Sequence, residues 1–358
     1  MDGPKALICT AVGKVEIQTV TKPTPPVGHV LVKTKAVALN PTDYKSIHEP
    51  HGSAIGKRPG VDFSGIIEEV GPDVTRPWKK GDRVAGSVFG AKDSQSGAFG
   101  DYVVVREHML LRLPDSMAFD RASTLGVGLT TCGQALYELL GLPLPPALPE
   151  TPPHTVLIGG GSTATATLGI QYAKLSGFRV ITTASPYNFE YLRSLGADIV
   201  LDYRESTEVL VEAIKEATGG NLTLAWDCSP NDKFHEVAAR AMSSTEKGIY
   251  ATVNPLTPGD FLAEINPMVE TKWQLAYTVF GEEFSFGPIT FPASEEDATF
   301  GAAFWERTAK LLAEEKLHPT RCTVNRGGEG LQGVIAGLDE LAQGKVAGTK
   351  LVYSMESL

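Results

Sequence analysis

Over the first third of the chain, short apolar runs alternate with turns that contain glycine or proline. The pattern predicts a hairpin over residues 5–20 and a long strand over residues 29–40. Three further strand segments are expected at residues 63–71, 82–90 and 100–114. Many short strands separated by turn signals are typical of a small barrel-like β domain.

The spacing of apolar residues becomes helical at residues 120–142, and a proline-rich surface loop follows at residues 143–153. From residue 154 onward, strand-like and helix-like patterns alternate. Strands are predicted at residues 155–160, 179–184, 198–203, 224–228, 248–254 and 275–281. This alternation indicates a parallel sheet with crossover helices. Amphipathic helices are then expected at residues 297–317 and 330–345, with a last strand at residues 349–355.

Length and composition narrow the class of protein. A chain of 358 residues exceeds one typical core, so two domains are expected. The formal net charge of -10 argues against non-specific nucleic-acid binding. The N-terminus shows no apolar secretory segment, and no apolar run is long enough to cross a bilayer. The four cysteines are widely spaced, which favours reduced thiols in a cytoplasmic protein and offers no clustered zinc ligands.

A glycine-rich turn follows the strand predicted at residues 155–160. Gly159, Gly161 and Ala164 fit the pattern G-x-G-x-x-G/A between a strand and a helix. The glycines allow the backbone to approach a pyrophosphate, and the helix N-terminus favours its negative charge. The strands that follow favour a dinucleotide-binding site over a merely structural turn.

The second strand of this sheet ends without an acidic residue. A site for NAD places Asp or Glu there to bind the ribose 2′-hydroxyl, whereas this chain has Ser185, Pro186, Tyr187 and Asn188. A carboxylate would repel a 2′-phosphate, so its absence favours NADPH. No arginine lies in the loop, and Arg204 or a lysine folded nearby would supply positive charge. The alternative is that Ser185 and Asn188 only shape a turn.

The order of domains and several motifs resemble the medium-chain dehydrogenase/reductase superfamily over essentially the whole chain. The N-terminal marker is GVDFSGIIEEVGPDV at residues 60–74. Zinc alcohol dehydrogenases have a His-Glu pair near its start, where this chain has Asp62-Phe63, so the resemblance is to the zinc-free, quinone-reductase-like branch. The motifs GGGSTATAT, SPYN, LDYR and GKVAGTKLV, the proline-rich insert and FGE at residues 280–282 are similar to those of trans-acting enoyl reductases of fungal iterative polyketide synthases, the family that includes the lovastatin enoyl reductase.

The resemblance implies an α/β fold in two parts. Residues 1–125 and 295–358 would form a GroES-like β-barrel catalytic domain, and residues 126–294 a Rossmann domain with a doubly wound parallel sheet that binds NADPH. The implied reaction is hydride transfer from NADPH to the β-carbon of an α,β-unsaturated polyketide thioester. A donor must then stabilise the enolate oxygen, and a proton must reach the α-carbon.

The family match carries specific residues over to this chain. Lys45 and Thr131 are the catalytic candidates, although a solvated lysine and a packed hydroxyl remain open. The cofactor residues implied are Thr42, Asp43, Tyr44, Lys45, Ser162, Thr163, Ala164, Thr165, Ser185, Pro186, Tyr187, Asn188, Tyr203, Val253, Asn254, Val346 and Ala347. The substrate residues implied are Cys132, Gly133, Gln134, Ala135, Leu136, Tyr137, Glu138, Leu139, Thr278, Val279, Phe280, Gly281 and Glu282. Asp43 could instead cap a helix, and residues 132–139 could instead be a buried helix face.

Three functions stay open on the sequence. The first is a trans-acting enoyl reductase whose partner is a polyketide synthase, or a hybrid with a peptide synthetase, that presents the substrate on its acyl carrier protein. The second is a stand-alone NADPH-dependent quinone or alkenal reductase, and the third a non-catalytic NADPH-binding interaction protein. No metal, nucleic acid or membrane is expected in any of them. The prolines at residues 288 and 292 favour a monomer, because they would blunt a sheet edge.

Overall fold

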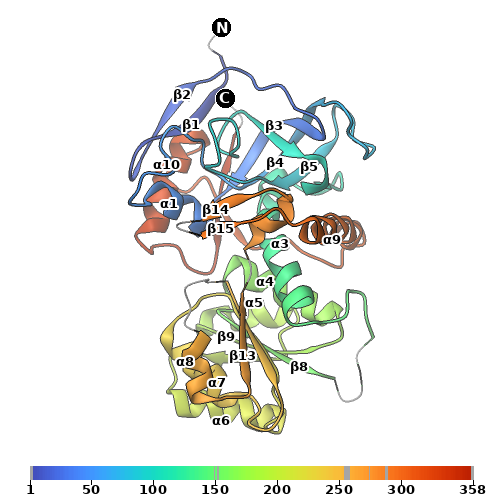
Figure 1. The fold of residues 1–358 in the computed structure, drawn as a ribbon, viewed down its shortest axis with the longest axis vertical. Coiled ribbons are helices and arrows are strands. Elements are labelled where there is room, and N and C mark those ends of the chain that lie inside the picture. Colours follow the sequence, from blue (N-terminus) through green and yellow to red (C-terminus); the bar gives the residue numbers. More distant parts are fainter. Residues whose placement is uncertain are drawn as a thin grey trace. The chain divides into compact units, whose positions relative to one another are not determined.

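The computed structural model describes residues 3–148, 150, 153–253, 259–273, 275–286 and 289–355. The chain divides into two compact units (Figure 1). Unit 1 comprises residues 1–130 and 277–358, and unit 2 comprises residues 131–276. The expected division placed residues 126–130 and 277–294 with the cofactor domain. They join unit 1 because the Val127 amide bonds to Asp62 and the Tyr277 ring stacks on Phe89.

Unit 1 is built on a mostly antiparallel sheet, in which only β16 and β17 pair in parallel among the described strands. Within the described residues the strand order is β16-β17-β3-β4-β5-β7. β6 pairs with residues 29–33 of β3, and β17 pairs with residues 36–38 of the same strand. A hairpin, β1-β2, precedes this sheet, and β14-β15 form a second small hairpin. The strands are β1 Lys5–Ala11, β2 Lys14–Thr19, β3 His29–Ala38, β4 Asp62–Val70, β5 Arg83–Ser87, β6 Tyr102–Arg106, β7 Leu110–Arg112, β14 Phe284–Phe286, β15 Ile289–Phe291, β16 Cys322–Val324 and β17 Lys350–Ser354.

The longest helix of unit 1 among the described residues, α9, begins at a polar residue that accepts a backbone hydrogen bond. At the start of α9, the Ser294 side chain accepts from the Asp297 amide, and three acidic residues in the first turn favour the helix dipole. The helices and 3-10 turns are α1 Pro41–Ile47, η1 Glu107–Met109, α2 Phe119–Ala122, η4 Ala276–Phe280, α9 Glu295–Ala313 and α10 Gly330–Ala342. α3 (Gly126–Gly133) crosses from unit 1 into unit 2.

Unit 2 has a parallel sheet in the order β10-β9-β8-β11-β12-β13. The strands are β8 Thr155–Gly159, β9 Arg179–Ala184, β10 Ile199–Asp202, β11 Leu224–Asp227, β12 Gly248–Thr252 and β13 Val269–Trp273. The first five were predicted. The sixth was placed wrongly at residues 275–281, where the structure has the 3-10 helix η4, because an apolar run of this length fits either a strand or a buried helical turn.

Helices cover both faces of this sheet, as a doubly wound fold requires. Leu157 and Tyr250 face a core shared with α6 and α7, whereas Trp226 faces the opposite side and packs against Gly169 of α4. The helical segments of unit 2 are η2 Gln134–Leu139, α4 Ala164–Leu175, η3 Pro186–Asn188, α5 Phe189–Ser194, α6 Thr207–Thr218, α7 Asp232–Ala241 and α8 Gly259–Ile265. The predicted β domain and parallel sheet are both confirmed.

The sheet order places a switch point between β8 and β11. The chain moves outward from β8 through β9 to β10, then returns to the other side of β8 at β11. In open parallel sheets, ligands bind beyond the carboxyl ends of the strands at such a point. The glycine-rich turn begins at the carboxyl end of β8, so it lies where this topology favours a ligand.

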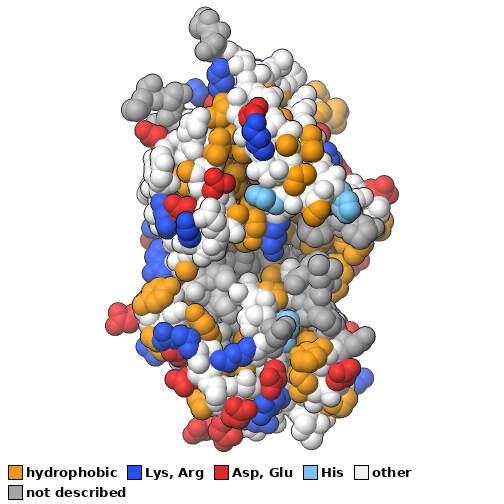
Figure 2. Space-filling view, turned by 90° about the vertical axis from the view of Figure 1, so that its left-hand side faces the viewer, with side chains coloured by type: hydrophobic (Ala, Val, Ile, Leu, Met, Phe, Trp, Pro, Cys, Tyr) orange, Lys and Arg blue, Asp and Glu red, His pale blue; other side chains and the backbone are white. Residues whose placement is uncertain are grey.

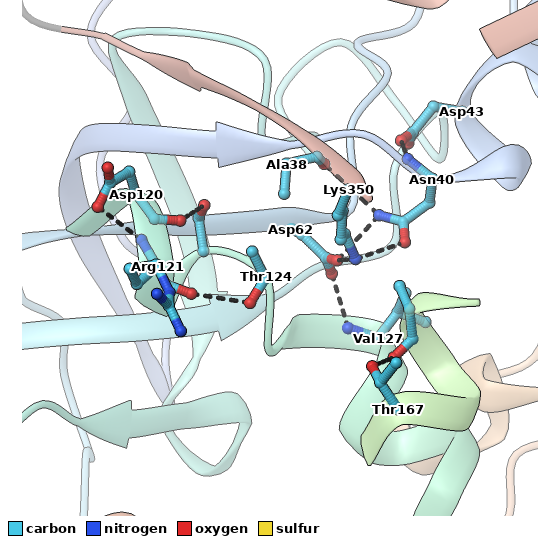
Figure 3. Close-up of polar contacts among 12 residues, drawn as sticks. Ala38, Asn40, Asp43, Asp62, Asp120, Arg121, Thr124, Val127, Thr167 and Lys350 are labelled. Carbon is cyan, nitrogen blue, oxygen red and sulfur yellow. Dashed lines mark hydrogen bonds and ion pairs between the residues drawn. The ribbon is translucent and has the colours of Figure 1, made fainter. Parts of the chain in front are cut away.

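A buried polar cluster in unit 1 fixes the entry to α1 (Figure 3). The Lys350 ammonium of β17 lies 2.6 Å from Asp62 Oδ2 and donates to Asn40 Oδ1 at 2.8 Å. Asn40 Nδ2 also donates to Asp62 Oδ2, and the Val127 amide donates to Asp62 Oδ1. Asp43, in the first turn of α1, accepts from the Asn40 amide. The cluster therefore joins β3, β4, β17 and α3 to the start of α1.

Asp43 is 2% exposed, and its burial raises the pKa of this carboxyl to about 8, although the Asn40 amide opposes the rise. A buried cap of this kind holds the first turn of α1 in place rather than facing a ligand. Asp43 therefore acts as a helix cap at the start of α1.

None of the described helices combines the length and apolar character that a membrane span needs. All four cysteines are free thiols. Figure 2 shows one face of the molecule, on which basic, acidic and hydrophobic side chains are interspersed.

Removing the Lys350 ammonium should strongly destabilise unit 1. Lys350→Met would leave the Asp62 carboxylate buried without its cation, and losing one partner of a buried pair costs about 3 to 5 kcal/mol. The measurement is the free energy of unfolding in urea. As a control, Lys310→Met breaks an exposed pair with Glu306, which should cost less than about 1 kcal/mol. Equal losses in the two variants would contradict the expectation.

Candidate active site

Helix α1 presents several of the candidate residues, with Thr42 near its start and Lys45 in its last turn. Lys45 is exposed, and no described residue forms a hydrogen bond or ion pair with its side chain. Thr42 is half-buried, and its Oγ1 lies 2.8 Å from the Tyr277 hydroxyl. Tyr44 is half-buried, with its ring edge-on to His48. Of these residues, Lys45 has an ammonium that can donate to a bound oxygen, whereas Asp43 points into the buried cluster.

An aromatic cluster lies beside Thr42 in unit 1. It consists of Phe89, Tyr277, Phe280, Phe284 and Phe291. The rings of Phe89 and Tyr277 stack with centroids 4.3 Å apart, and Phe284 packs edge-on against both. Burial raises the pKa of the Tyr277 hydroxyl above its ordinary value. Sequence reasoning did not select Phe89 or Tyr277, because no motif marks an aromatic residue whose partner lies far along the chain.

The predicted substrate run at residues 278–282 has a buried and a charged part. Thr278, Val279 and Phe280 are buried, and Gly281 and Glu282 are half-buried. Glu282 forms ion pairs with Lys92 and Arg106. Burial alone would raise the pKa of Glu282, but hydrogen bonds from these two cations lower it below its ordinary value. The Glu282 carboxylate therefore anchors the run to β6 and to the loop after β5.

The glycine-rich turn of unit 2 is tightly packed and has no room for a side chain at Gly160. Gly160 has a φ of 66°, which favours glycine, and a Cβ there would lie 2.6 Å from Ser229 Cβ. Thr163 caps α4 by accepting from the Ala166 amide. Ser162, Thr163, Ala164 and Thr165 are all half-buried at the start of α4. The turn and helix N-terminus thus have the features that hold a pyrophosphate, so the residues fit a dinucleotide.

The loop after β9 has polar groups of two kinds. The Ser185 hydroxyl lies 3.4 Å from the Tyr203 hydroxyl, and Tyr187 and Tyr203 are exposed. Pro186 is exposed as well, whereas Asn188 is buried and so does not face solvent. This arrangement leaves Ser185 and the two tyrosines as the accessible groups of the loop.

Of the two sources of positive charge that the sequence suggested, Arg204 or a lysine folded nearby, the structure has a lysine, Lys233, beside Tyr203. Arg204 is bound to Asp202 in a bidentate ion pair, with Nη2 2.7 Å from Oδ2. Lys233, at the start of α7, donates to the backbone carbonyls of Tyr203 and Glu205. Lys233 is thus a cation beside Tyr203 that only folding reveals. Within the described residues the end of β9 carries no carboxylate, in keeping with the sequence.

The predicted substrate run at residues 132–139 begins in α3 and continues as a π-helical segment, η2. Cys132, Gly133, Gln134, Ala135 and Leu136 are buried, while Thr131, Tyr137, Glu138 and Leu139 are half-buried. Burial raises the pKa of the Cys132 thiol well above its ordinary value, and the thiol donates to the Thr165 carbonyl. The Cys132 thiol is therefore not activated as a nucleophile. π-helical segments occur often at functional sites, and no sequence signal marked this one.

The remaining candidates lie at strand and helix ends. Val253 follows β12, and its amide donates to the Asp227 carbonyl. Val346 is half-buried and Ala347 exposed in the segment before β17. Asn254 lies outside the described residues. Lys45, Ser185, Tyr187, Tyr203 and the glycine-rich turn are among the candidates with accessible polar groups in the structure.

The described residues do not fit a zinc ion. They contain no group of three His, Cys, Asp or Glu side chains arranged to hold a metal. The Asp62 carboxylate, which lies in the motif where zinc alcohol dehydrogenases have their His-Glu pair, is engaged by the Lys350 ammonium.

Comparison with known proteins identifies both units. Residues 26–115 match the family described as "Alcohol dehydrogenase GroES-like domain", and residues 164–281 match "Zinc-binding dehydrogenase". The trans-enoyl reductase ACTTS2 of Alternaria alternata is 38% identical over 354 residues, covering 98% of this chain and 99% of that protein. The trans-enoyl reductase resD of Aspergillus sclerotiorum is 39% identical over 372 residues, with the same coverage of 98% and 99%.

Solved structures agree on the fold. An alcohol dehydrogenase superfamily protein from Novosphingobium aromaticivorans superposes with a TM-score of 0.80 at 22% identity, covering 99% of each chain. Together with the identity to the fungal proteins over nearly the full length, these matches show that the chain belongs to the medium-chain dehydrogenase/reductase superfamily of oxidoreductases and, within it, to the trans-enoyl reductase family.

Proposed function

We propose that this chain is a trans-acting, NADPH-dependent enoyl reductase that serves a separate polyketide synthase in the cytoplasm. Its substrate would be an α,β-unsaturated polyketide thioester held on the acyl carrier protein of that synthase. The observation that carries the proposal is the identity of 38–39% to proteins named trans-enoyl reductase, which extends through both units. The word "trans" in those names supports a partner on another chain.

The reaction requires three tasks, and residues of the chain are proposed for one of them, the stabilisation of the enolate oxygen. When bound, the nicotinamide ring supplies the hydride that the β-carbon of the enoyl group accepts. Lys45 and Thr131 are proposed to donate hydrogen bonds to the thioester oxygen or to the nicotinamide carboxamide and ribose. A donor at the thioester oxygen stabilises the enolate as its negative charge develops. The α-carbon then takes a proton, with solvent water as one source.

The binding residues are proposed in the same way. The glycine-rich turn and the start of α4 would hold the pyrophosphate, and Ser185 with Lys233 would receive the 2′-phosphate. The Ser185 hydroxyl and the cationic Lys233 support NADPH over NADH, because a 2′-phosphate carries negative charge. Nothing in the geometry of the described residues favours a quinone, so the stand-alone quinone reductase is an outcome of the test rather than a second proposal.

The proposal predicts a substrate preference that NADPH absorbance can measure. The purified chain should oxidise NADPH in the presence of an α-methylcrotonyl pantetheine thioester, and much more slowly with a free quinone or with NADH. Turnover of the quinone but not of the thioester would favour the stand-alone reductase. If both substrates stay unreacted, even with the thioester on an acyl carrier protein, while NADPH binds, the chain is a non-catalytic binding protein.

The proposed donors predict a loss of rate with the thioester substrate. Lys45→Met and Thr131→Val should each lower kcat for the thioester by about 10²-fold, the usual effect of removing one oxyanion donor. Lys33→Met is a matched control, because Lys33 is an exposed lysine on β3 of the same unit. Equal kcat values for Lys45→Met and Lys33→Met would rule out Lys45 as a hydrogen-bond donor in the reaction.

The proposed cofactor preference predicts the effect of a carboxylate after β9. Ser185→Asp should raise the Kd for NADPH by about tenfold or more, since a carboxylate repels the 2′-phosphate, while the Kd for NADH stays level or falls. Quenching of intrinsic fluorescence by each dinucleotide gives both constants. Ser194→Asp, an exposed position on α5, adds the same charge as a control. An equal change for the two dinucleotides at position 185 would contradict the placement of the 2′-phosphate.

A further inference from the structure

Three titratable side chains lie buried together at the carboxyl edge of the sheet in unit 2, and the proposed reaction uses none of them. Asp227 ends β11 and is fully buried, Tyr250 lies on β12, and His235 lies on α7. The Tyr250 hydroxyl donates to Asp227 Oδ2 at 2.6 Å, and His235 Nε2 lies 3.5 Å from the same oxygen. We name these residues the Asp227 triad.

The Asp227 triad lies at the switch point of the sheet. Asp227 pairs with Gly159 of β8 on one side and with Thr252 of β12 on the other. Its backbone carbonyl accepts from the Val253 amide, and the Cys228 amide donates to the Gly159 carbonyl. Gly159 begins the glycine-rich turn, and Val253 is a candidate cofactor residue. The carboxylate is therefore directly beside two segments proposed to hold the dinucleotide.

The second carboxylate oxygen fixes the loop that packs against the turn. Asp227 Oδ1 accepts from the Ser229 amide at 2.9 Å. Ser229 Cβ lies 2.6 Å from the point where a Cβ on Gly160 would stand. On the same side, the Phe234 ring lies 2.4 Å from the corresponding point at Gly159. The segment from Ser229 to Phe234 therefore packs closely against both glycines.

Burial makes this arrangement costly unless the carboxylate is well satisfied. Burial raises the pKa of Asp227 above its ordinary value, although the Tyr250 hydrogen bond opposes the rise, and it also raises the pKa of Tyr250. An apolar pair of similar volume would fill the same space without that cost. What an apolar pair would lack is the directional hold on the Ser229 amide.

We infer that Asp227 and Tyr250 are positioning residues for the cofactor: they hold the loop at residues 228–231 against Gly159 and Gly160 and so set the shape of the pyrophosphate turn, while His235 packs edge-on against the Tyr250 ring. The inference rests on the proposed function, because it needs a dinucleotide in this turn. It also specifies that the triad acts on the part common to NADPH and NADH, and not on the 2′-phosphate.

Tyr250→Phe tests the inference, since it removes one hydroxyl and keeps the ring. The Kd of the variant should rise about tenfold for NADPH and by the same factor for NADH, as read by fluorescence quenching of the full chain. The KM for the pantetheine thioester should stay within twofold. Asp227→Asn should raise both Kd values too, and the double variant should show less than the sum of the two effects, because the two side chains act as one unit.

The control is a buried hydrogen-bonding residue at the amino ends of the strands of the same sheet, whereas Asp227 lies at the carboxyl ends. Asn266 is 6% exposed and donates to the carbonyls of Ala239, Met242 and Ser243, just before β13 begins. Asn266→Ala should lower the melting temperature of the chain while leaving both Kd values within twofold. This contrast separates a general loss of stability from a change in the turn.

The outcomes are distinct. Unchanged Kd values in Tyr250→Phe and Asp227→Asn, or equal increases in Tyr250→Phe and Asn266→Ala, would overturn the inference and leave the triad a purely structural element. A rise for NADPH alone would also overturn it, because the triad would then act on the 2′-phosphate. If the unaltered chain binds neither dinucleotide, the proposed function itself is refuted. Binding with the expected Kd shifts but without thioester turnover would refute the proposed reaction and support the inference.

Discussion

The ion pair between Lys350 and Asp62 is the contact on which the arrangement of unit 1 depends. It joins β17 to β4, and through Asn40 it fixes the start of α1. The groups are almost fully buried, so neither can be removed without leaving an unpaired charge in the interior. The exposed Lys45 projects from a helix whose first turn is held by this pair. The position of a solvent-accessible ammonium is thus set by a buried one.

Unit 2 also has a buried carboxylate that fixes a neighbouring segment, but its partners differ. There a buried carboxylate, Asp227, is held by the Tyr250 hydroxyl and holds the Ser229 amide beside the glycine-rich turn. In both units the carboxylate lies at an end of a strand, where it accepts a hydrogen bond from a backbone amide outside that strand: Val127 for Asp62 and Ser229 for Asp227. Neither carboxylate is proposed to react. Each fixes a segment that carries candidate binding groups, and directional hydrogen bonds do this more strictly than apolar packing can.

Several candidate residues changed meaning once their surroundings were known. Asp43 and Asn188 are polar residues in motifs that suggest ligand contact, yet both side chains are buried. The sequence suggests Arg204 as a cation for the 2′-phosphate, yet Arg204 is bound to Asp202. Lys233 lies beside Tyr203 instead. Tyr277 and Phe89 form the centre of an aromatic cluster that no motif indicates. In every case the deciding factor was burial or pairing, which the tertiary structure sets.

Most of the elements and their order follow from the local pattern of the sequence. Apolar periods of two and 3.6 gave the β domain, the first five strands of the parallel sheet and the amphipathic helices, because these periods follow from local backbone geometry. The glycine-rich turn was recognisable because its glycines are needed within a few residues of one another. The tertiary structure alone decided which charges are paired. Lys350 and Asp62 are 288 positions apart, and Asp227 meets Tyr250 across neighbouring strands, so no local pattern records either contact. It also decided that residues 276–280 form a helical turn, since an apolar run specifies burial and not the backbone conformation in which it is buried.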